Sequence, residues 1–361
     1  MKKILYIGHL IEKPTTGGEV CCFYNQLVLK EIFGNGFHFV SVSNENKIQI
    51  FINKFLFFYP GLSIKTIDRI LSQIKLLSPE YVFIETAQYG ILTKLIKLKI
   101  KNIKVITFFH NIEIQYAKSY LSLKNPKSWY FYLLTKYNET KAVKYSDYKF
   151  AINDTDSKLM YKLYGIEADF IMPFSIENKV SREMHDSLLA NNRIIYGKKA
   201  LFVGSNFFGN TDGLHWFINT ILPKLDIHLT IVGKGMSKAF TDSEKVTVFD
   251  FVDDISSFYR STEFVLLPII SGGGMKTKVA EAMMWGKVIL ATENAFVGYN
   301  TSDCNGLYCC NSFDDYAKAI SDIQSNNFLL FNENIHQQFL NFHSIQTTVE
   351  KTKVFFINRG I

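Results

Sequence analysis

The sequence has no apolar run long enough to cross a membrane. A spanning helix needs about 20 largely apolar residues, and the nearest approach, from Phe51 to Leu62, is interrupted by Lys54 and Pro60. No secretory signal is expected either, because the short start MKKILYIGHL leads directly into charged residues and a proline. We therefore expect a cytoplasmic protein that does not span the membrane.

Cysteine is too sparse and too irregularly spaced for a metal cluster. The five cysteines form two adjacent pairs, Cys21–Cys22 and Cys309–Cys310, with Cys304 on its own. An odd count without a signal sequence favours a reducing compartment. The one Asp-x-Asp sequence, Asp154 to Asp156, fits the start of a helix better than a metal site. We expect no metal ion and no cofactor.

A strong charge of either sign is also lacking. The chain has 40 basic and 33 acidic residues, a net charge of +7, and a hydrophobic share of 47%. These values describe a globular protein with a generous core, and its length favours about two domains. Such a mild positive charge suits phosphorylated substrates, an anionic membrane surface or nucleic acid, and charge alone does not choose among them.

What the sequence does contain is a regular alternation of short apolar strands and helices. This alternation predicts parallel, doubly wound α/β sheets. The strands are expected at residues 2–10, 37–42, 81–85, 105–109 and 148–152 in the first half, and at 199–204, 227–232, 246–249, 264–268 and 288–291 in the second.

The two series of strands predict two domains with a linker between them. We expect a first Rossmann-like domain over residues 1–175, a linker over 176–197 and a second Rossmann-like domain over 198–345. The final segment, 346–361, is expected to form a helix that crosses back to the first domain. Two such halves predict a ligand cleft between the domains.

The stretch IISGGGMKTKVAEAMMWGKVILA, residues 269–291, is the strongest candidate for a binding site. Three glycines after a buried strand open a helix, and such a loop offers free backbone amides to a phosphate. Lys278, Glu281 and Trp285 are spaced to share one face of that helix. A cation beside a carboxylate one turn away suits a nucleotide diphosphate with its ribose. The alternative is a solvated Lys–Glu pair on a surface helix.

The first half has two weaker signals. Gly17 and Gly18 stand between a strand and a helix, as at the opening of a phosphate-binding βα unit, although a full G-x-G-x-x-G is missing. His110 directly follows the fourth predicted strand, and ligands in open α/β sheets bind beyond the carboxyl ends of strands. Alternatively, His110 caps the next helix or packs against the sheet.

Residues 114–145 are basic and aromatic, with lysines interleaved among tyrosines and Trp129. Pro126 is expected to divide them into two helices. Amphipathic helices of this composition can lie on anionic lipid. The alternative is an ordinary helix pair packed on the sheet with a solvated basic edge.

The second half resembles the C-terminal domain of glycosyltransferase family 4, whose members are retaining enzymes with the GT-B fold. The resemblance runs in order through VGSNFFGNTDGLHWF, LTIVGKG, VTVFDFVDD and GGGMKTKVAEAMMWGKVILAT. In the first half it is weaker and rests on Gly17–Gly18, on His110–Asn111 and on AINDTDSKLMYKLYG. It covers nearly the whole chain.

The resemblance implies two Rossmann-like domains facing a central cleft, with the donor held mainly by the second. Glu281 would bind the ribose hydroxyls, and Lys276 and Lys278 would act in catalysis by holding the diphosphate. His110 would be the third catalytic residue, beside the transferred sugar. The remaining donor-binding residues implied are Gly17, Gly18, Gly273, Gly274, Asn206, Phe251 and Val252.

Two family features are missing from this sequence. The first glutamate of the Glu-x7-Glu motif would stand at position 273, which is a glycine. The basic pair after the first strand of the second domain is replaced by the loop Ser205–Asn210. Phosphate charge would therefore rest chiefly on Lys276 and Lys278.

We thus expect a retaining glycosyltransferase that uses a nucleotide sugar, a UDP sugar in preference to a GDP sugar, in the assembly of a bacterial surface polysaccharide. Its expected partners are a glycan or lipid-linked acceptor and, through residues 114–145, an anionic membrane surface, but no nucleic acid. The alternatives are a sugar-nucleotide epimerase and a non-catalytic partner protein with the same fold.

Overall fold

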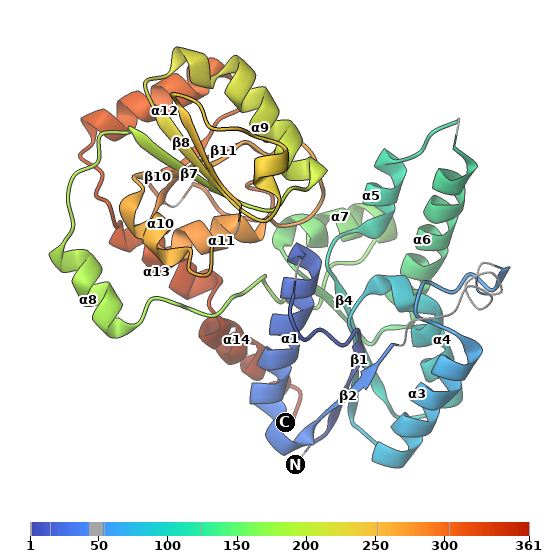
Figure 1. Ribbon diagram of the computed structural model, residues 1–361. Coiled ribbons are helices and arrows are strands. Elements are labelled where there is room, and N and C mark those ends of the chain that lie inside the picture. Colours follow the sequence, from blue (N-terminus) through green and yellow to red (C-terminus); the bar gives the residue numbers. More distant parts are fainter. Residues whose placement is uncertain are drawn as a thin grey trace. The chain divides into compact units, whose positions relative to one another are not determined.

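The structure is a computed structural model that describes residues 2–14, 16–42, 53, 55–123, 125–250, 252–302 and 304–360 (Figure 1). The chain packs as two units. The first comprises residues 1–174 together with 348–361, and the second comprises residues 175–347. Each unit is an α/β structure built on one parallel sheet, as the alternation of strands and helices predicted.

The first unit contains a six-stranded sheet in the order β2-β1-β3-β4-β5-β6. All of its neighbouring strands are parallel. The sheet reverses its order between β1 and β3, which is its topological switch point. The strands are β1 (Ile4–Gly8), β2 (Phe37–Ser41), β3 (Tyr81–Ile84), β4 (Lys104–Phe109), β5 (Tyr148–Ala151) and β6 (Phe170–Ile171).

Helices cover both faces of this sheet (Figure 1). Helices α3 and α4 bury Ile70 and Leu92 in one apolar cluster with Leu5 and Val82 of the strands. On the other face, Phe356 of α14 meets the ring of Tyr81, with 5.2 Å between the ring centroids. The helices of this unit are α1 (Gly17–Phe33), α3 (Ile64–Leu77), α4 (Gly90–Lys99), α5 (Glu113–Ser119), α6 (Pro126–Tyr145) and α7 (Asp154–Tyr164), with the short turns η1 (Gly34–Gly36) and η2 (Ala87–Tyr89).

The second unit has a six-stranded sheet in the order β12-β11-β10-β7-β8-β9, again parallel throughout. Its switch point lies between β7 and β10, from which the chain proceeds outward in both directions. The strands are β7 (Lys199–Val203), β8 (His228–Val232), β9 (Val246–Phe249), β10 (Phe264–Leu267), β11 (Val288–Ala291) and β12 (Leu307–Cys309).

The helices around the second sheet pack through large buried rings. Tyr316 of α12 meets Phe217 of α9, and Trp285 stacks on Tyr259 of α10. Gly286 follows with a φ of 58°, the left-handed conformation expected just past a helix end. The helices are α8 (Arg182–Ala190), α9 (Phe208–Thr220), α10 (Ser256–Ser261), α11 (Thr277–Met284), α12 (Phe313–Ser325) and α13 (Glu333–Phe342), with η3 (Leu222–Lys224) and η4 (Met236–Lys238).

Helix α14 (Ile345–Ile357) contains the junction at which the chain passes from the second unit to the first. Its residues from 348 onward group with the first unit, where Phe355 packs on Tyr148 and Phe150. The segment 176–197, which we expected to be a linker, contains α8 and groups with the second unit.

Candidate functional site

The switch point of the second sheet lies between the carboxyl ends of β7 and β10. Strand β7 leads into Gly204 and the loop up to Asn206, and β10 leads into Pro268 and the three glycines that precede α11. In open α/β sheets this is the position at which ligands bind. The loop singled out from the sequence therefore lies at the most favourable place in its own unit.

The glycine loop is held together by Lys276. Its ammonium group donates to the carbonyl oxygens of Gly272, Gly273 and Gly274 at 3.2, 3.2 and 2.7 Å. Gly272 and Gly274 have φ values of 98° and 72°, which disfavour any residue with a side chain. Burial, and secondarily the neighbouring charge of Lys278, lowers the pKa of Lys276 to about 8. Lys276 thus organises the loop, a role that the sequence does not reveal.

Lys278 is the amine that is left for a ligand. It has no hydrogen-bond or ion-pair partner in the part of the chain that the structure describes, and its amine lies 6.0 Å from the centroid of the Phe202 ring. Burial lowers its pKa, while Glu281 acts in the opposite direction. A side chain at Gly204 would meet Lys278 Cε at 2.6 Å. The glycine therefore leaves room for this lysine at the end of β7.

Glu281 lies on α11 one turn beyond Lys278. Burial raises its pKa, and the charges of Lys179 and Lys278 and the hydroxyl of Tyr259 act against that rise. Trp285 is buried and stacks on the same Tyr259, with 5.8 Å between the ring centroids. Of the three residues expected on one helix face, Trp285 therefore belongs to the core.

The other donor residues expected in the second unit have separate surroundings. Asn206 is exposed and joins two loops, since its side-chain amide donates to the Gly235 carbonyl at 3.0 Å. Val252 is half-buried after β9, whereas Phe251 lies outside the described residues. Gly273, where the motif glutamate was expected, is exposed.

In the first unit, Gly17 and Gly18 form the first turn of α1 rather than a separate loop. Thr16 caps this helix by accepting from the Glu19 amide, and the Glu19 carboxylate accepts from the Thr16 amide in return. A side chain added at Gly18 would meet nothing within 4 Å. The start of α1 therefore combines the positive end of a helix dipole with open space.

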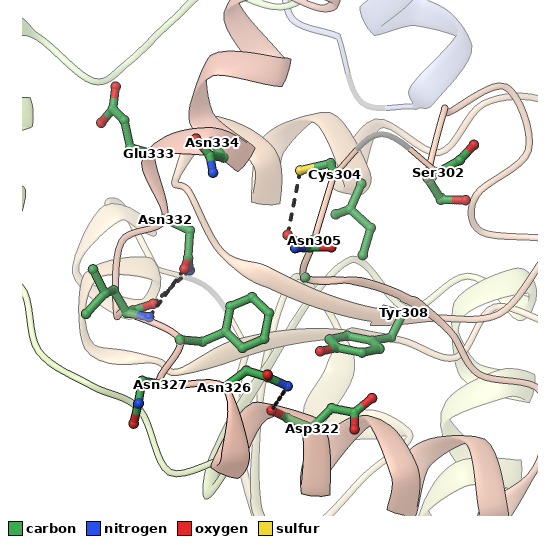
Figure 2. Close-up of a pocket in the computed structure, with 15 residues that line it drawn as sticks. Ser302, Cys304, Asn305, Tyr308, Asp322, Asn326, Asn327, Asn332, Glu333 and Asn334 are labelled. Carbon is green, nitrogen blue, oxygen red and sulfur yellow. Dashed lines mark hydrogen bonds between the residues drawn. The ribbon is translucent and has the colours of Figure 1, made fainter.

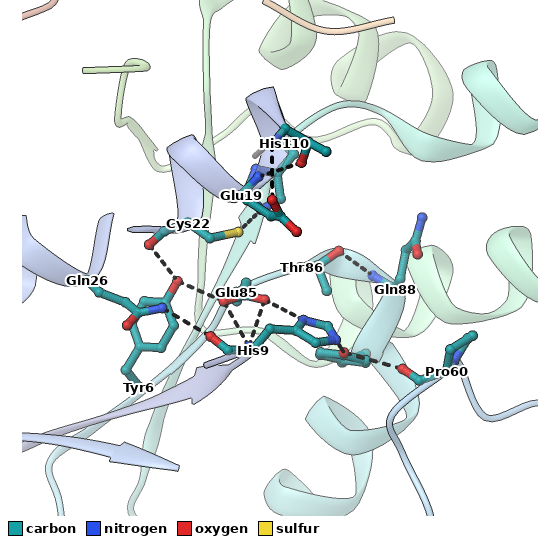
Figure 3. Close-up of polar contacts among 12 residues, drawn as sticks. Tyr6, His9, Glu19, Cys22, Gln26, Pro60, Glu85, Thr86, Gln88 and His110 are labelled. Carbon is teal, nitrogen blue, oxygen red and sulfur yellow. Dashed lines mark hydrogen bonds and ion pairs between the residues drawn. The ribbon is translucent and has the colours of Figure 1, made fainter. Parts of the chain in front are cut away.

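His110 follows β4 and is half-buried. Its Nε2 lies 3.4 Å from the Cys22 sulfur on α1 (Figure 3). Burial lowers the pKa of His110, and the carboxylate and backbone of Glu85 partly oppose that effect. The side chain is therefore neutral near pH 7 and takes part in a polar network.

Two members of that network, His9 and Glu85, were missed in the sequence. We took Glu85 for the last residue of a strand, but β3 ends at Ile84, so Glu85 stands at the carboxyl end of the sheet. His9 stands at the corresponding position after β1. The sequence feature that could have identified them is an ionisable residue directly after each of two apolar runs.

One pocket of the second unit lies away from the switch point. It has a volume of about 760 Å³ and is formed by the loop before β12 and the turn after α12. Figure 2 shows Asn305, Tyr308 and Asn326 among its lining residues. None of the described lining residues is a lysine or arginine. This pocket is therefore poorly suited to a diphosphate, unlike the surroundings of Lys278.

A comparison with protein families gives a match in the second unit. Residues 197–326 match the family model of the glycosyl transferases group 1. Over these residues the second unit is similar to glycosyl transferases group 1 domains. Solved structures over the whole chain show that the fold is GT-B. The predicted fold class is thereby confirmed, and the finer assignment to family 4 stays a prediction.

Two solved structures illustrate the likeness in fold. The apo form of the lipopolysaccharide outer core galactosyltransferase WaaB has a TM-score of 0.64 at 13% identity and covers 99% of both chains. Anabaena HepE in complex with UDP-glucose has a TM-score of 0.65 at 10% identity, covering 99% of this chain and all of that one.

A relative in sequence comes from Klebsiella pneumoniae. A 44.6 kDa protein in the cps region of Klebsiella pneumoniae, described as uncharacterized, is 26% identical over 304 residues. The match covers 76% of this chain and 72% of the relative. Among the helices that the structure describes, none is both long enough and apolar enough to cross a membrane.

Proposed function

We propose that this GT-B protein is a retaining glycosyltransferase that moves a sugar from a nucleotide sugar to a glycan or lipid-linked acceptor. The observation that carries the proposal is Lys278, a half-buried amine without a partner among the described residues, beside a glycine loop at the switch point of the second unit, which is similar to group 1 domains. A desolvated amine beside backbone amides suits the phosphates of a donor.

In this proposal Lys278 and the loop amides stabilise the negative charge that develops on the leaving diphosphate. Donors aimed at developing charge in a desolvated site make a large contribution to rate. Lys276 keeps the loop in shape, and Glu281 binds the ribose hydroxyls. In the retaining scheme that the family resemblance implies, the departing phosphate accepts the proton of the acceptor hydroxyl. The contact of His110 with the transferred sugar stays a prediction.

We further propose a UDP sugar as the donor and surface polysaccharide assembly at the cytoplasmic face of the membrane as the setting. Support for the nucleotide comes from the similar fold of Anabaena HepE, which was solved with UDP-glucose. Support for the setting comes from the cps-region relative of Klebsiella pneumoniae.

The test is a panel of UDP-, GDP- and dTDP-sugars, read by thermal shift and by release of the nucleotide. We expect stabilisation by UDP and its sugars, with slow release of UDP in the absence of acceptor. No stabilisation by any nucleotide would reject the transferase and leave a non-catalytic partner protein. Conversion of the sugar without release of nucleotide would indicate an epimerase instead. With an acceptor in hand, NMR of the product decides whether the anomeric configuration is retained.

A separate proposal concerns helix α6, which we infer to contact an anionic membrane. Its inner face is packed, since Leu134, Asn138 and Ala142 are buried. On its outer face Trp129, Leu133 and Tyr137 recur every four residues and are 43%, 49% and 38% exposed. These apolar side chains alternate with exposed lysines, which is the composition of interfacial helices.

Flotation with liposomes that contain anionic lipid tests the membrane contact. We expect binding that is strongest at low salt, because electrostatic attraction is least screened there. The double variant Trp129→Ala, Leu133→Ala should lose it, whereas Tyr196→Ala, which removes an even more exposed ring in the second unit, should not. Flotation that is absent at low salt, or equal in both variants, would reject this contact.

A further inference from the structure

Glu85 is a buried carboxylate at the switch point of the first sheet. Only 3% of the residue is exposed. The Tyr6 hydroxyl donates to it at 3.2 Å, the His9 amide donates at 3.0 Å, and His9 Nδ1 lies 2.9 Å away. Figure 3 shows the carboxylate between the side chains of Tyr6 and His9. Three donors surround this buried carboxylate. The fold therefore specifies its position, unlike that of a carboxylate in a surface ion pair.

The backbone at Gly8 is shaped to admit this carboxylate. A side chain on Gly8 would come within 2.0 Å of Glu85 Oε2. The strand before His9 therefore ends in the one residue type that lets Glu85 reach both the His9 amide and the His9 ring. Such a close approach is a typical reason for glycine at the end of a strand.

Glu85 acts on two histidines from different strands. Its carboxylate orients the ring of His9, whose Nε2 lies 3.2 Å from the Tyr89 hydroxyl and whose side chain is 47% exposed. Its backbone lies against the ring of His110, on the next strand of the sheet. Both histidines stand at carboxyl ends of strands, where an open α/β sheet meets its ligand.

These surroundings shift the pKa values of the two histidines in opposite directions. The hydrogen bond to Glu85 raises the pKa of His9 above its usual value, helped by the charges of Glu85 and of Glu19 on α1 and opposed by burial. Burial lowers the pKa of His110. Two titratable groups whose pKa values are shifted in opposite directions are the usual arrangement of an acid and a base.

We propose that Glu85 is a positioning residue: its carboxylate orients His9 and its backbone orients His110 toward a hydroxyl-bearing sugar substrate at the carboxyl ends of β1, β3 and β4. This inference rests on the proposed transferase function and assigns the first unit's part in it. His9 Nε2 donates to a substrate oxygen in place of the Tyr89 hydroxyl, and neutral His110 accepts from a substrate hydroxyl at Nε2 in place of the Cys22 thiol.

The test compares Glu85→Gln, just after β3, with a matched control just before the same strand. Gln keeps the size of the side chain and removes its charge. Glu80→Gln removes a carboxylate next to the amino end of β3, where Glu80 pairs with Lys2 at the surface. We expect Glu85→Gln to lower turnover with acceptor by about tenfold to a hundredfold, by analogy with the loss of partners that orient metal-binding histidines. The KM for the donor and all constants of Glu80→Gln should stay unchanged.

A second readout separates positioning from simple loss of structure. In Glu85→Gln the His9 ring should titrate at lower pH by NMR, because it loses the carboxylate that favours its charged form. The acidic limb of the pH–rate profile should move to lower pH as well, since His110 loses the charge of Glu85 that favours its protonation.

The outcomes are distinguishable from a failure of the proposed function. If the wild type releases no nucleotide with any donor, the transferase proposal fails, while the NMR titration still tests the two histidines. An unchanged His9 titration in Glu85→Gln overturns the positioning role. Unchanged turnover with acceptor in a folded Glu85→Gln overturns the role toward substrate.

Discussion

The two sheets of this protein place different ionisable groups at their switch points. Where the first sheet reverses order, between β1 and β3, the buried group is the carboxylate of Glu85 with two histidines around it. Where the second sheet reverses order, between β7 and β10, the charged groups are Lys276 and Lys278. An amine favours the polyanionic part of a substrate, and a histidine pair favours hydroxyl oxygens. The difference supports separate roles for the two units in the proposed reaction.

The contrast extends into the interior of each unit. In the first unit, burial raises the pKa of Glu113 and of Glu139 to about 7. In the second unit, burial lowers the pKa of Lys287 to about 7. Near pH 7 these two carboxyls and this amine are therefore poised between their charged and neutral forms, and the carboxyls and the amine contribute to stability with opposite dependence on pH.

The largest effect is expected from Lys278→Ala. The variant removes an amine that has no partner among the described residues at the second switch point, so turnover should fall by about 10²–10³-fold, as for loss of one donor to a developing charge. Lys278→Arg should retain part of the activity, because a guanidinium also binds phosphate. The measurement is kcat with a saturating donor. If Lys278→Ala turns over like the wild type, the charge contrast between the two switch points has no bearing on catalysis.

The next effect concerns Glu281 and the ribose. We expect Glu281→Gln to weaken binding of UDP by about tenfold. Loss of a charge-assisted hydrogen bond costs about 1.5–3 kcal/mol of binding free energy, and the Gln amide recovers part of it. The control is a dideoxyribose nucleotide, which lacks the hydroxyls that Glu281 is proposed to bind. Wild type and variant should bind that nucleotide equally, as measured by calorimetry. A variant that weakens both nucleotides alike would assign Glu281 to the fold instead.

The sequence predicted the sheets better than it predicted the roles of the side chains. Long apolar runs gave the central strands, but β6 has two residues and β12 has three, too few for a pattern. Lys276 was expected to bind phosphate, yet its amine is taken by three carbonyls of its own loop. That convergence depends on the φ values of the glycines, which the order of residue types does not specify. Glu85 was missed because its neighbours His9 and Tyr6 are far from it in sequence.

A smaller effect concerns how the stability of each unit depends on pH. A carboxyl group with a raised pKa favours the folded state at low pH, and this contribution is lost as the pH rises from about 4.5 to about 7. Glu139→Gln should therefore flatten the pH dependence of the first unit's stability in that window, by on the order of 1–3 kcal/mol. Hydrogen exchange of amides in β3 and β4 reports this unit separately.

Lys287 supplies the opposite case in the second unit. As the pH falls from 10.5 toward about 7, the unfolded chain takes up a proton that the folded chain does not, so stability is lost. Lys287→Met should remove that slope, read by exchange of amides in β10 and β11. The same slope in both units, or no response to either substitution, would contradict the contrast.

The smallest effect is expected at Gly273, where the family motif has a glutamate. Unlike Gly272 and Gly274, Gly273 is not in the left-handed region, and it is exposed. Gly273→Glu should therefore fold with a stability within about 0.5 kcal/mol of the wild type, whereas Gly272→Ala should lose about 1–3 kcal/mol through backbone strain alone. Thermal unfolding measures both. We expect turnover of Gly273→Glu to stay within a few-fold of the wild type, because Lys278 and the loop that Lys276 holds are unchanged. A gain of about tenfold or more, equivalent to 1.4 kcal/mol, would instead mean that the second unit lacks a contact to the donor sugar that a carboxylate at this position can restore.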